Sequence, residues 1–274
     1  MPPPCIEGSI ARSGPILVLT GAGISAESGI PTFRGTEGIW TVGSRHYRPQ
    51  ELATLAAFQA MPTEIWGWYL YRLGLCMKAA PNAAHRALVS LEEALGNRFL
   101  LITQNVDGLH LRAGQSSHRT YEIHGNIGFM RCSHECSSEV RALPESLTEN
   151  WNEDRALGTE ELNLLACPHC GELSRPHVLW FDECYDEDYY RYESSLEAAQ
   201  QASLLIVVGT SGATSLPMHI AEICAARETP MVVIDPADNP FSAMARGQAN
   251  GKAVAGTAVS MIPALVDEVI DQLA

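Results

Sequence analysis

The chain has 274 residues, 46% of them hydrophobic and 18% charged, which suits one large soluble domain or a domain with a sizeable insertion. Its formal net charge of −14 argues against a nucleic-acid-binding surface, and no apolar run approaches the roughly 18 residues of a membrane span. The first residues, MPPPCIEGSIARSG, have the features of neither a signal peptide nor a transit peptide, so we expect a cytoplasmic protein whose cysteines are thiols or metal ligands. Only Lys78 and Lys252 are lysines among 18 basic residues, a bias that indicates a GC-rich bacterial source.

The first predicted element is a buried strand at residues 15–20, which runs into Gly21, Ala22 and Gly23. A tight turn and then a helix should follow. Gly21-x-Gly23-x-x-Ala26 fits the dinucleotide fingerprint, in which glycines let backbone N–H groups approach a pyrophosphate at the positive end of the helix. An ordinary strand-to-helix turn is the alternative, because this fingerprint alone is weak evidence.

The dehydrogenase form of this fingerprint also needs a second strand that ends in an acidic residue about 20 residues further on. That strand is missing here. Residues 29–35, GIPTFRG, instead form a loop rich in glycine and proline that contains Phe33 and Arg34. We expect this loop to cover a cofactor.

The next segments favour helices. Residues 45–61 carry a weak helical pattern that ends at Pro62. Residues 63–78 carry a strong pattern with Thr63 as the expected N-cap, and a further helix should start at Pro81 and stop at Gly96.

The remaining chain alternates strands with helices. Strands are expected at residues 99–103, 120–124, 175–180, 204–208 and 231–235, and helices at residues 186–202, 214–227 and 262–273. Alternation of this kind predicts an α/β fold with a parallel sheet and right-handed crossovers. Ligand groups should then gather at the carboxyl ends of the strands, which bear Gly21, Gln104, His124, Gly209 and Asp235.

Residues 131–176 have a different character, with four cysteines, many acidic residues and little periodicity. Cys132 and Cys136 are separated by three residues, and Cys167 and Cys170 by two. Four thiolates spaced in this way can hold one structural Zn²⁺ with no open coordination position. The competing interpretations are a redox pair at Cys167 and Cys170, or a histidine, His134 or His169, in place of one cysteine.

His124 stands out among the nine histidines because it ends a strand at the same sheet edge as the glycine turn and Asn105. It could act there as a general base near a bound ribose.

Taken together, the segments GAGISAESGIPTFRG, TQNVDGLH, HG, RPHVLWF and GTS, in this order and with the two cysteine pairs, resemble the sirtuins, a family of NAD-dependent protein lysine deacylases. The resemblance runs from about residue 15 to about residue 270. It implies a Rossmann-like NAD-binding domain at residues 1–43, 83–128 and 177–274. A helical insertion at residues 44–82 and a zinc-binding module at residues 129–176 would form the small domain, with NAD and an acyl-lysine peptide bound between the two domains.

The resemblance also implies roles for individual residues. His124 would be the catalytic base, assisted by Asn105 and Asp107. The acyl oxygen would attack the anomeric carbon as nicotinamide leaves, His124 would then deprotonate the ribose diol, and hydrolysis would release lysine and O-acyl-ADP-ribose. The NAD site would comprise Gly21, Ala22, Gly23, Phe33, Arg34, Gln104, Asn105, Asp107, Gly209, Thr210, Ser211 and Asp235, the last of which stands where the family more often has asparagine.

Tyr69 and Arg72 share one face of the helix predicted at residues 63–78. From spacing alone, the aromatic residues around them form a core stripe and Arg72 is its solvated edge. Within the family, the pair resembles the tyrosine and arginine of the desuccinylase-like class, where they would grip the carboxylate of a succinyl or malonyl group. Trp180 and Phe181 would contact the same substrate.

Two positions depart from the family pattern. Three residues instead of two separate Cys132 from Cys136, which predicts a looser zinc site or another ligand. Asp182 replaces the glycine that the family generally has, and its side chain could crowd the peptide or favour basic flanking residues.

Three functions remain open from the sequence. The first is a deacylase that uses NAD and zinc and acts, as a monomer, on acylated-lysine proteins or peptides. The second is a protein mono-ADP-ribosyltransferase with the same NAD site, and the third is a non-catalytic binding module, which the presence of Asn105, Asp107 and His124 disfavours. The missing acidic residue argues against a dehydrogenase, and the closed metal site argues against a zinc hydrolase.

Overall fold

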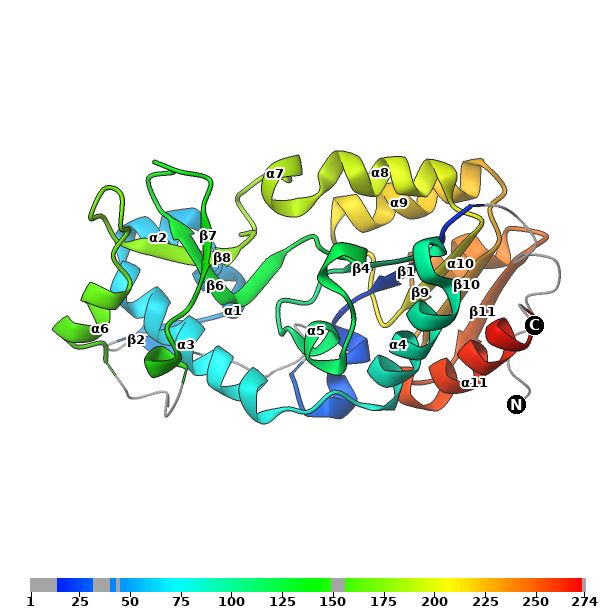
Figure 1. The fold of residues 1–274 in the computed structure, drawn as a ribbon, viewed down its shortest axis with the longest axis horizontal. Coiled ribbons are helices and arrows are strands. Elements are labelled where there is room, and N and C mark those ends of the chain that lie inside the picture. Colours follow the sequence, from blue (N-terminus) through cyan, green and yellow to red (C-terminus); the bar gives the residue numbers. More distant parts are fainter. Residues whose placement is uncertain (1–13, 32–39, 43–44, 149–155, 273–274) are drawn as a thin grey trace.

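The computed structural model describes residues 14–31, 40–42, 45–148 and 156–272. Phe33 and Arg34, with the rest of the expected cover loop from residue 32 on, lie outside the described residues. The chain forms a larger lobe, which carries both ends of the described chain, and a smaller lobe beside it (Figure 1).

The larger lobe is built on one parallel sheet in the strand order β11-β10-β9-β1-β4-β5. Its strands are β1 (Ile16–Thr20), β4 (Phe99–Thr103), β5 (Thr120–Glu122), β9 (Leu204–Val208), β10 (Met231–Asp235) and β11 (Gly251–Ala255). The chain adds β4 and β5 on one side of β1 and then returns to add β9, β10 and β11 on the other side. The strand order therefore reverses between β1 and β9, which is where α/β sheets bind their ligands.

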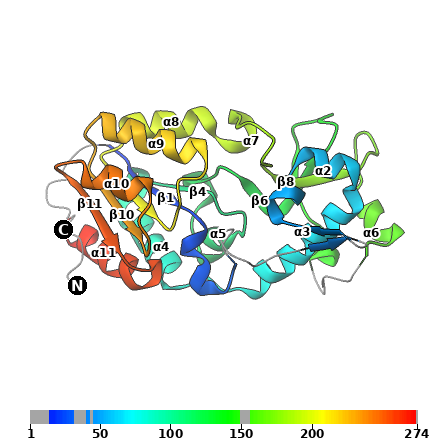
Figure 2. The same cartoon turned by 180° about the vertical axis from the view of Figure 1, so that it is seen from behind.

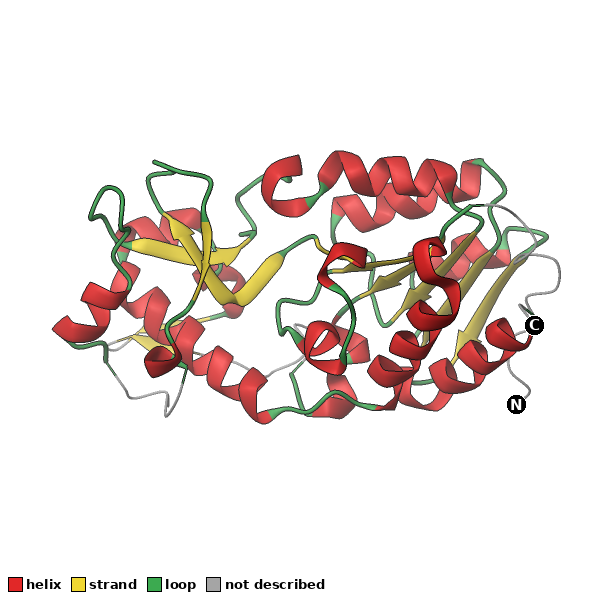
Figure 3. Ribbon diagram, viewed as in Figure 1, coloured by secondary structure: helices red, strands yellow, loops and turns green. Residues whose placement is uncertain are grey.

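Helices cover both faces of this sheet (Figures 1 and 3). On one face α4 (Ala83–Leu95) and α11 (Ala258–Asp271) pack on the sheet, and on the other α8 (Tyr192–Gln201), α9 (Ser215–Ala226) and α10 (Pro240–Arg246). Each layer encloses its own apolar core, so the strands are buried on both sides, as their continuous runs of branched residues predict. The predicted α/β fold is confirmed.

The smaller lobe combines helices with an antiparallel sheet in the order β7-β6-β8 (Figure 2). Its elements are β2 (Trp40–Val42), β3 (Arg45–Tyr47), α1 (Pro49–Leu52), α2 (Leu55–Ala60), α3 (Pro62–Lys78), β6 (Gly125–Cys132), β7 (Val140–Ala142), η5 (Glu145–Leu147), α6 (Thr159–Leu164) and β8 (Ser174–Val178). Trp66 of α3 is fully buried and donates a hydrogen bond from its indole nitrogen to the Ser174 carbonyl at 2.7 Å. This bond ties α3 to β8.

The strand predicted at residues 175–180 was wrongly assigned to the main sheet. The observed strand β8 pairs with β6 instead, and Ser174 lies opposite Cys132 in that pairing. A short apolar run does not specify its partner strand, and here the neighbouring cysteine pairs bring β6 and β8 together.

The helix expected directly after the glycine turn is also not observed. The chain forms two short 3₁₀ turns, η1 (Ala22–Ile24) and η2 (Ala26–Ser28). The second turn ends at Gly29, whose φ of 85° is left-handed and incompatible with a continuing helix.

Several boundaries differ from the expected ones. Helix α3 begins at Pro62 with Met61 as N-cap, so Thr63 is not the cap, and the helix predicted at residues 186–202 is interrupted by Arg191 with a φ of 55°. The weak pattern at residues 45–61 forms β3, α1 and α2 rather than one helix. The sequence did not predict α10, β11, the strands β6 and β7 of the smaller lobe, or the short elements η3 (Gly96–Arg98), α5 (Leu109–Ala113) and η4 (Ser117–Arg119). The first part of the helix predicted at residues 186–202 is α7 (Glu187–Tyr190).

Candidate functional site

Two glycine loops meet at the carboxyl ends of β1 and β9. Gly21 donates its backbone hydrogen bond to the Val208 carbonyl at 3.0 Å, and Gly23 donates to the Gly209 carbonyl at 2.9 Å. A Cβ atom on Gly23 would lie 2.6 Å from the Gly209 Cα, and Gly209 itself has a left-handed φ of 58°. Only glycine fits at this contact, so the edge of the sheet presents backbone rather than side chains to a ligand.

Gln104 joins the ends of β4 and β9 at the same edge. Its amide nitrogen donates to the Thr210 hydroxyl at 2.8 Å, and its amide oxygen accepts from the Thr214 hydroxyl at 3.0 Å. The expected gathering of polar groups at the strand ends is confirmed for these residues.

Asn105 and Asp107 meet on the hydroxyl of Ser25. The Asn105 amide donates to Ser25 Oγ at 3.1 Å, and Ser25 donates to one Asp107 carboxylate oxygen at 2.7 Å. The other carboxylate oxygen accepts from the backbone N–H of Leu109 at 2.8 Å. Burial raises the pKa of Asp107, against these hydrogen bonds. The sequence analysis missed Ser25 as a site residue, although a hydroxyl two residues after the glycine turn was a usable signal.

His124 lies just after β5, at the same edge of the sheet as Gln104. Its Nδ1 lies 3.0 Å from the Gln104 carbonyl oxygen, which can only accept, so Nδ1 carries the ring proton and Nε2 has the free lone pair. Burial lowers the pKa of His124 to about 4, so the imidazole is neutral near pH 7. The Tyr185 hydroxyl lies 2.7 Å from Nε2, a contact that nothing in the sequence pattern indicated.

The predicted substrate residues are distributed between the core and the surface. The Tyr69 hydroxyl accepts a hydrogen bond from the Trp180 indole nitrogen at 2.8 Å, and both side chains are buried. The Arg72 guanidinium carbon lies 5.2 Å from the centre of the Trp68 ring, which is also buried. The aromatic stripe expected on α3 is therefore part of the core. Phe181, in contrast, is 59% exposed.

Asp182 is exposed, and its carboxylate binds the start of a neighbouring helix. Its two carboxylate oxygens accept hydrogen bonds from the backbone N–H groups of Leu55 at 2.7 Å and Ala56 at 3.1 Å. These are unpaired donors of the first turn of α2, so Asp182 caps that helix from a distant part of the chain.

Asp235 binds a backbone N–H group of its own loop. At the end of β10, one of its carboxylate oxygens accepts from the backbone N–H of Ala237 at 2.9 Å, and its side chain is half-buried. Ser211 is half-buried beside Thr210 in the loop after β9. Both positions lie at the edge of the sheet where the sequence placed them.

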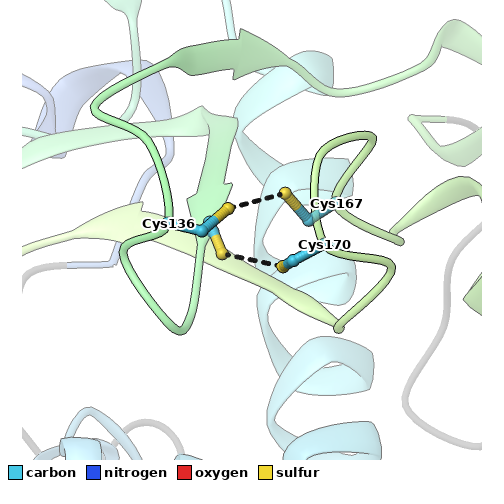
Figure 4. Close-up of side chains that lie close together, drawn as sticks. Cys136, Cys167 and Cys170 are labelled. Atoms are coloured by element: carbon cyan, nitrogen blue, oxygen red, sulfur yellow. Dashed lines mark hydrogen bonds between the residues drawn. The ribbon is translucent and has the colours of Figure 1, made fainter.

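The four cysteines of the smaller lobe converge, with all four sulfur atoms within 4.8 Å of one another. The closest distances run between the two pairs, at 3.6 Å from Cys132 to Cys170 and 3.5 Å from Cys136 to Cys167 (Figure 4). A tetrahedron with Zn–S bonds of about 2.3 Å places its sulfur atoms about 3.8 Å apart, so this group fits Zn²⁺.

The extra residue between Cys132 and Cys136 does not loosen the site. Glu135 takes a left-handed φ of 51° and its backbone N–H bonds to the Cys132 carbonyl, which turns Cys136 toward the other sulfur atoms. Among the described residues the cluster of close ligand atoms consists of the four cysteines, and His169 instead has its Nε2 2.9 Å from a Glu139 carboxylate oxygen. The tetrathiolate arrangement is the one that the described residues support.

None of the helices in the described part of the chain has the length and apolar character needed to cross a membrane.

The fold and the site define a class of protein: a parallel α/β domain with a glycine-lined ligand edge, joined to a four-cysteine module. Residues 21–215 match the model of the Sir2 family, and the chain belongs to this family. The resemblance to the sirtuins is thereby confirmed.

Among curated relatives, the chain is 40% identical over 256 residues to an NAD-dependent protein deacylase of Leptospira interrogans, covering 93% of each chain. It is 39% identical over 241 residues to an NAD-dependent protein deacylase of Aquifex aeolicus, covering 88% of this chain and 91% of that protein.

Solved structures give the same result. A Sir2 homologue in complex with NAD superposes with a TM-score of 0.77 at 31% identity, covering 98% of this chain and 94% of that one. A Sir2 protein with a p53 peptide and NAD⁺ has a TM-score of 0.71 at 25% identity, covering 96% and 95% of the two chains.

Proposed function

We propose that this chain is an NAD-dependent protein-lysine deacylase that removes succinyl and malonyl groups as well as acetyl groups. The acyl preference rests on the position of Tyr69 and Arg72. The Tyr69 hydroxyl accepts a hydrogen bond from the Trp180 indole, and Arg72 follows about one helical turn further along α3. The relatives named above support the use of NAD and the deacylation itself.

The nucleotide would bind across the reversal point of the sheet. A pyrophosphate would bind beside the contact of the two loops, where Gly21, Gly23 and Gly209 present backbone without a Cβ atom. Asp235 and Ser211 lie further along the same edge, in position for the adenosine half. The four-cysteine group would hold a structural Zn²⁺, remote from the chemistry.

The nicotinamide ribose would lie over Asn105, Asp107 and Ser25. Mutual hydrogen bonds fix the orientation of these side chains. A carboxylate and an amide at this position favour the positive charge that develops on the ribose as nicotinamide leaves and the acyl oxygen attacks.

His124 would then act as general base. Its Nε2 carries the free lone pair, and the neutral ring can take a proton from a ribose hydroxyl. Water completes the reaction and releases free lysine and O-acyl-ADP-ribose.

The acyl group would lie against α3. Burial raises the pKa of Tyr69, so its phenol stays neutral, and because Trp180 donates to its oxygen, the phenol proton remains available for a carboxylate. Arg72 adds a planar guanidinium that can bind a carboxylate through two hydrogen bonds. An acetyl group lacks this carboxylate and would not use the pair.

Mass spectrometry of one peptide, carrying either succinyl-lysine or acetyl-lysine and incubated with and without NAD, tests the proposal. Arg72→Met should lower kcat/KM for the succinyl peptide by roughly 100-fold, the value of one charge-assisted bidentate contact, and that for the acetyl peptide by less than about threefold. Lys78→Met is the matched control, since it removes an exposed cation from the last turn of the same helix.

Equal losses on both peptides would show that Arg72 is only structural. If NAD were consumed without loss of either acyl group, the mono-ADP-ribosyltransferase would become the better assignment.

A further inference from the structure

The base nitrogen of His124 is already occupied by a side chain that the proposed reaction does not use. Tyr185 lies in the loop between β8 and α7, and its hydroxyl oxygen is 2.7 Å from Nε2 of His124. The two rings lie 5.8 Å apart between centroids and are tilted by 32°. This is a direct contact with the group proposed as base.

The direction of this hydrogen bond follows from the other side of the imidazole. Because the Gln104 carbonyl accepts from Nδ1, the neutral ring has its only lone pair on Nε2. Tyr185 must therefore donate. A ribose hydroxyl that is to lose its proton to His124 needs the same lone pair, so the phenol and the ribose cannot both occupy it.

The phenol that donates to His124 lies in a polar network at the strand ends. His124 Nδ1 donates to the backbone carbonyl of Gln104, the Gln104 side-chain oxygen accepts from the Thr214 hydroxyl, and Thr214 is a neighbour of the Tyr185 phenol. Burial raises the pKa of Tyr185 to about 12, so the phenol keeps its proton at neutral pH. On its other side the ring stacks on Tyr192 at 6.2 Å between centroids.

We propose that Tyr185 is a positioning residue for the base: it holds His124 in the reactive tautomer and orientation until the ribose hydroxyl replaces it on Nε2. This inference rests on the proposed deacylase function. In the step that follows, the ribose O–H bond breaks and an Nε2–H bond forms, with no change in oxidation state. The Tyr185 oxygen is then free to accept from the new N–H group and stabilise the imidazolium.

Two reactions of the enzyme separate this role from a merely structural one. Exchange of labelled nicotinamide into NAD, in the presence of acyl peptide, reports bond breaking before His124 acts, whereas peptide deacylation requires the base. Tyr185→Phe should lower kcat for deacylation about tenfold, as expected for an oriented base that loses one hydrogen bond, and change nicotinamide exchange by less than about twofold. Tyr192→Phe is the control, because it keeps the ring stack and removes a phenol hydroxyl that is not the partner of His124.

Nitrogen-15 NMR of the histidine side chains gives a readout that does not depend on turnover. In the wild-type protein without ligand, the Nε2 signal of His124 should carry the shift of a hydrogen-bonded acceptor, and Tyr185→Phe should move it. An unchanged signal, or deacylation and exchange that fall equally, would overturn the role of Tyr185. Wild-type protein that catalyses neither reaction would instead overturn the proposed function, and the NMR result would still report the bond.

Discussion

In the larger lobe every residue of β1 and β9 is buried, whereas the interior of the smaller lobe contains guanidinium groups and thiols. Apolar side chains form both layers that sandwich the large sheet. The smaller lobe has one apolar cluster, formed mainly by α3.

Two buried arginines belong to this smaller interior. Arg131 and Arg175 are only 3% and 2% exposed, and both lie near the Glu183 carboxylate. The Arg175 guanidinium also lies 3.5 Å from the centre of the Trp180 ring. Within the described residues, the Nε atoms of both arginines have no hydrogen-bond partner.

This difference indicates how each lobe responds to a change. Burial of apolar surface is insensitive to metal and only weakly sensitive to pH, so the larger lobe should depend mainly on steric fit. The smaller lobe depends on charged, titratable and metal-binding groups, each of which needs a particular partner. Conditions that remove those partners should act on the smaller lobe first.

The largest expected effect is removal of zinc. Metal bound to four thiolates contributes its binding free energy to folding, on the order of 10 kcal/mol for small structural sites, so chelation should unfold the smaller lobe while the large sheet remains. Elemental analysis should find one zinc per chain in the wild type and none in Cys136→Ser, and hydrogen exchange should show lost protection in β6, β7 and β8. Cys184→Ser, at an exposed cysteine outside the cluster, should retain the zinc.

Equal loss of protection in both lobes on chelation would contradict the comparison, because it would mean that the larger lobe also depends on the metal.

The next effect concerns the larger lobe. Gly23→Ala places a Cβ atom 2.6 Å from the backbone of Gly209, so one of the two loops must shift. We expect a loss of about 3 kcal/mol or more in the free energy of unfolding, together with loss of NAD binding. Thermal unfolding and calorimetric titration with NAD measure both.

Gly29→Ala is the control for this change. Gly29 has a φ of 85° but nothing within 4 Å of the added atom, so only the backbone strain of about 1 kcal/mol remains. If both variants bound NAD equally well, the close contact of the two loops would not be needed for the site.

The sequence predicted the larger lobe better than the smaller one, because the apolar burial that stabilises the larger lobe leaves a pattern in the sequence. Branched apolar runs such as residues 204–208 are buried on both sides and identify strands of a parallel sheet, and the glycine turn marks where it binds ligand. The motifs also identified Gln104 and His124, whose places at the sheet edge follow from strand order alone.

The smaller lobe depends on contacts between residues far apart in the chain, which no local pattern contains. Asp182 caps α2 across 127 residues, and Trp66 bonds to the Ser174 carbonyl across 108. Glu135 has a positive φ, which accommodates the extra residue between Cys132 and Cys136. This conformation likewise depends on the meeting of the four sulfur atoms. In the smaller lobe, the hydrophobic pattern therefore predicted β8 but neither its partner strand β6 nor these long-range contacts.

The smallest expected effect is a pH dependence that originates in the smaller lobe. His177, in β8, is 8% exposed and packs against the rings of Tyr189 and Tyr190. Burial, together with the positive charges of Arg131 and Arg175, lowers its pKa to about 4. Because the folded state binds the proton less well than the unfolded state, His177 contributes stability above pH 6.5 that is lost as the pH falls toward 4.

His177→Gln should remove this dependence. The difference between 6.5 and about 4 corresponds to at most about 3 kcal/mol, so urea unfolding of the wild type between pH 7.5 and pH 4.5 should lose up to roughly that much more stability than the variant loses. His118→Gln, at an exposed position of η4, should follow the wild type at every pH. A His177→Gln protein with the full pH dependence of the wild type would place the acid sensitivity elsewhere, and the larger lobe, with His85 and His110 buried under its sheet edge, would then be the source.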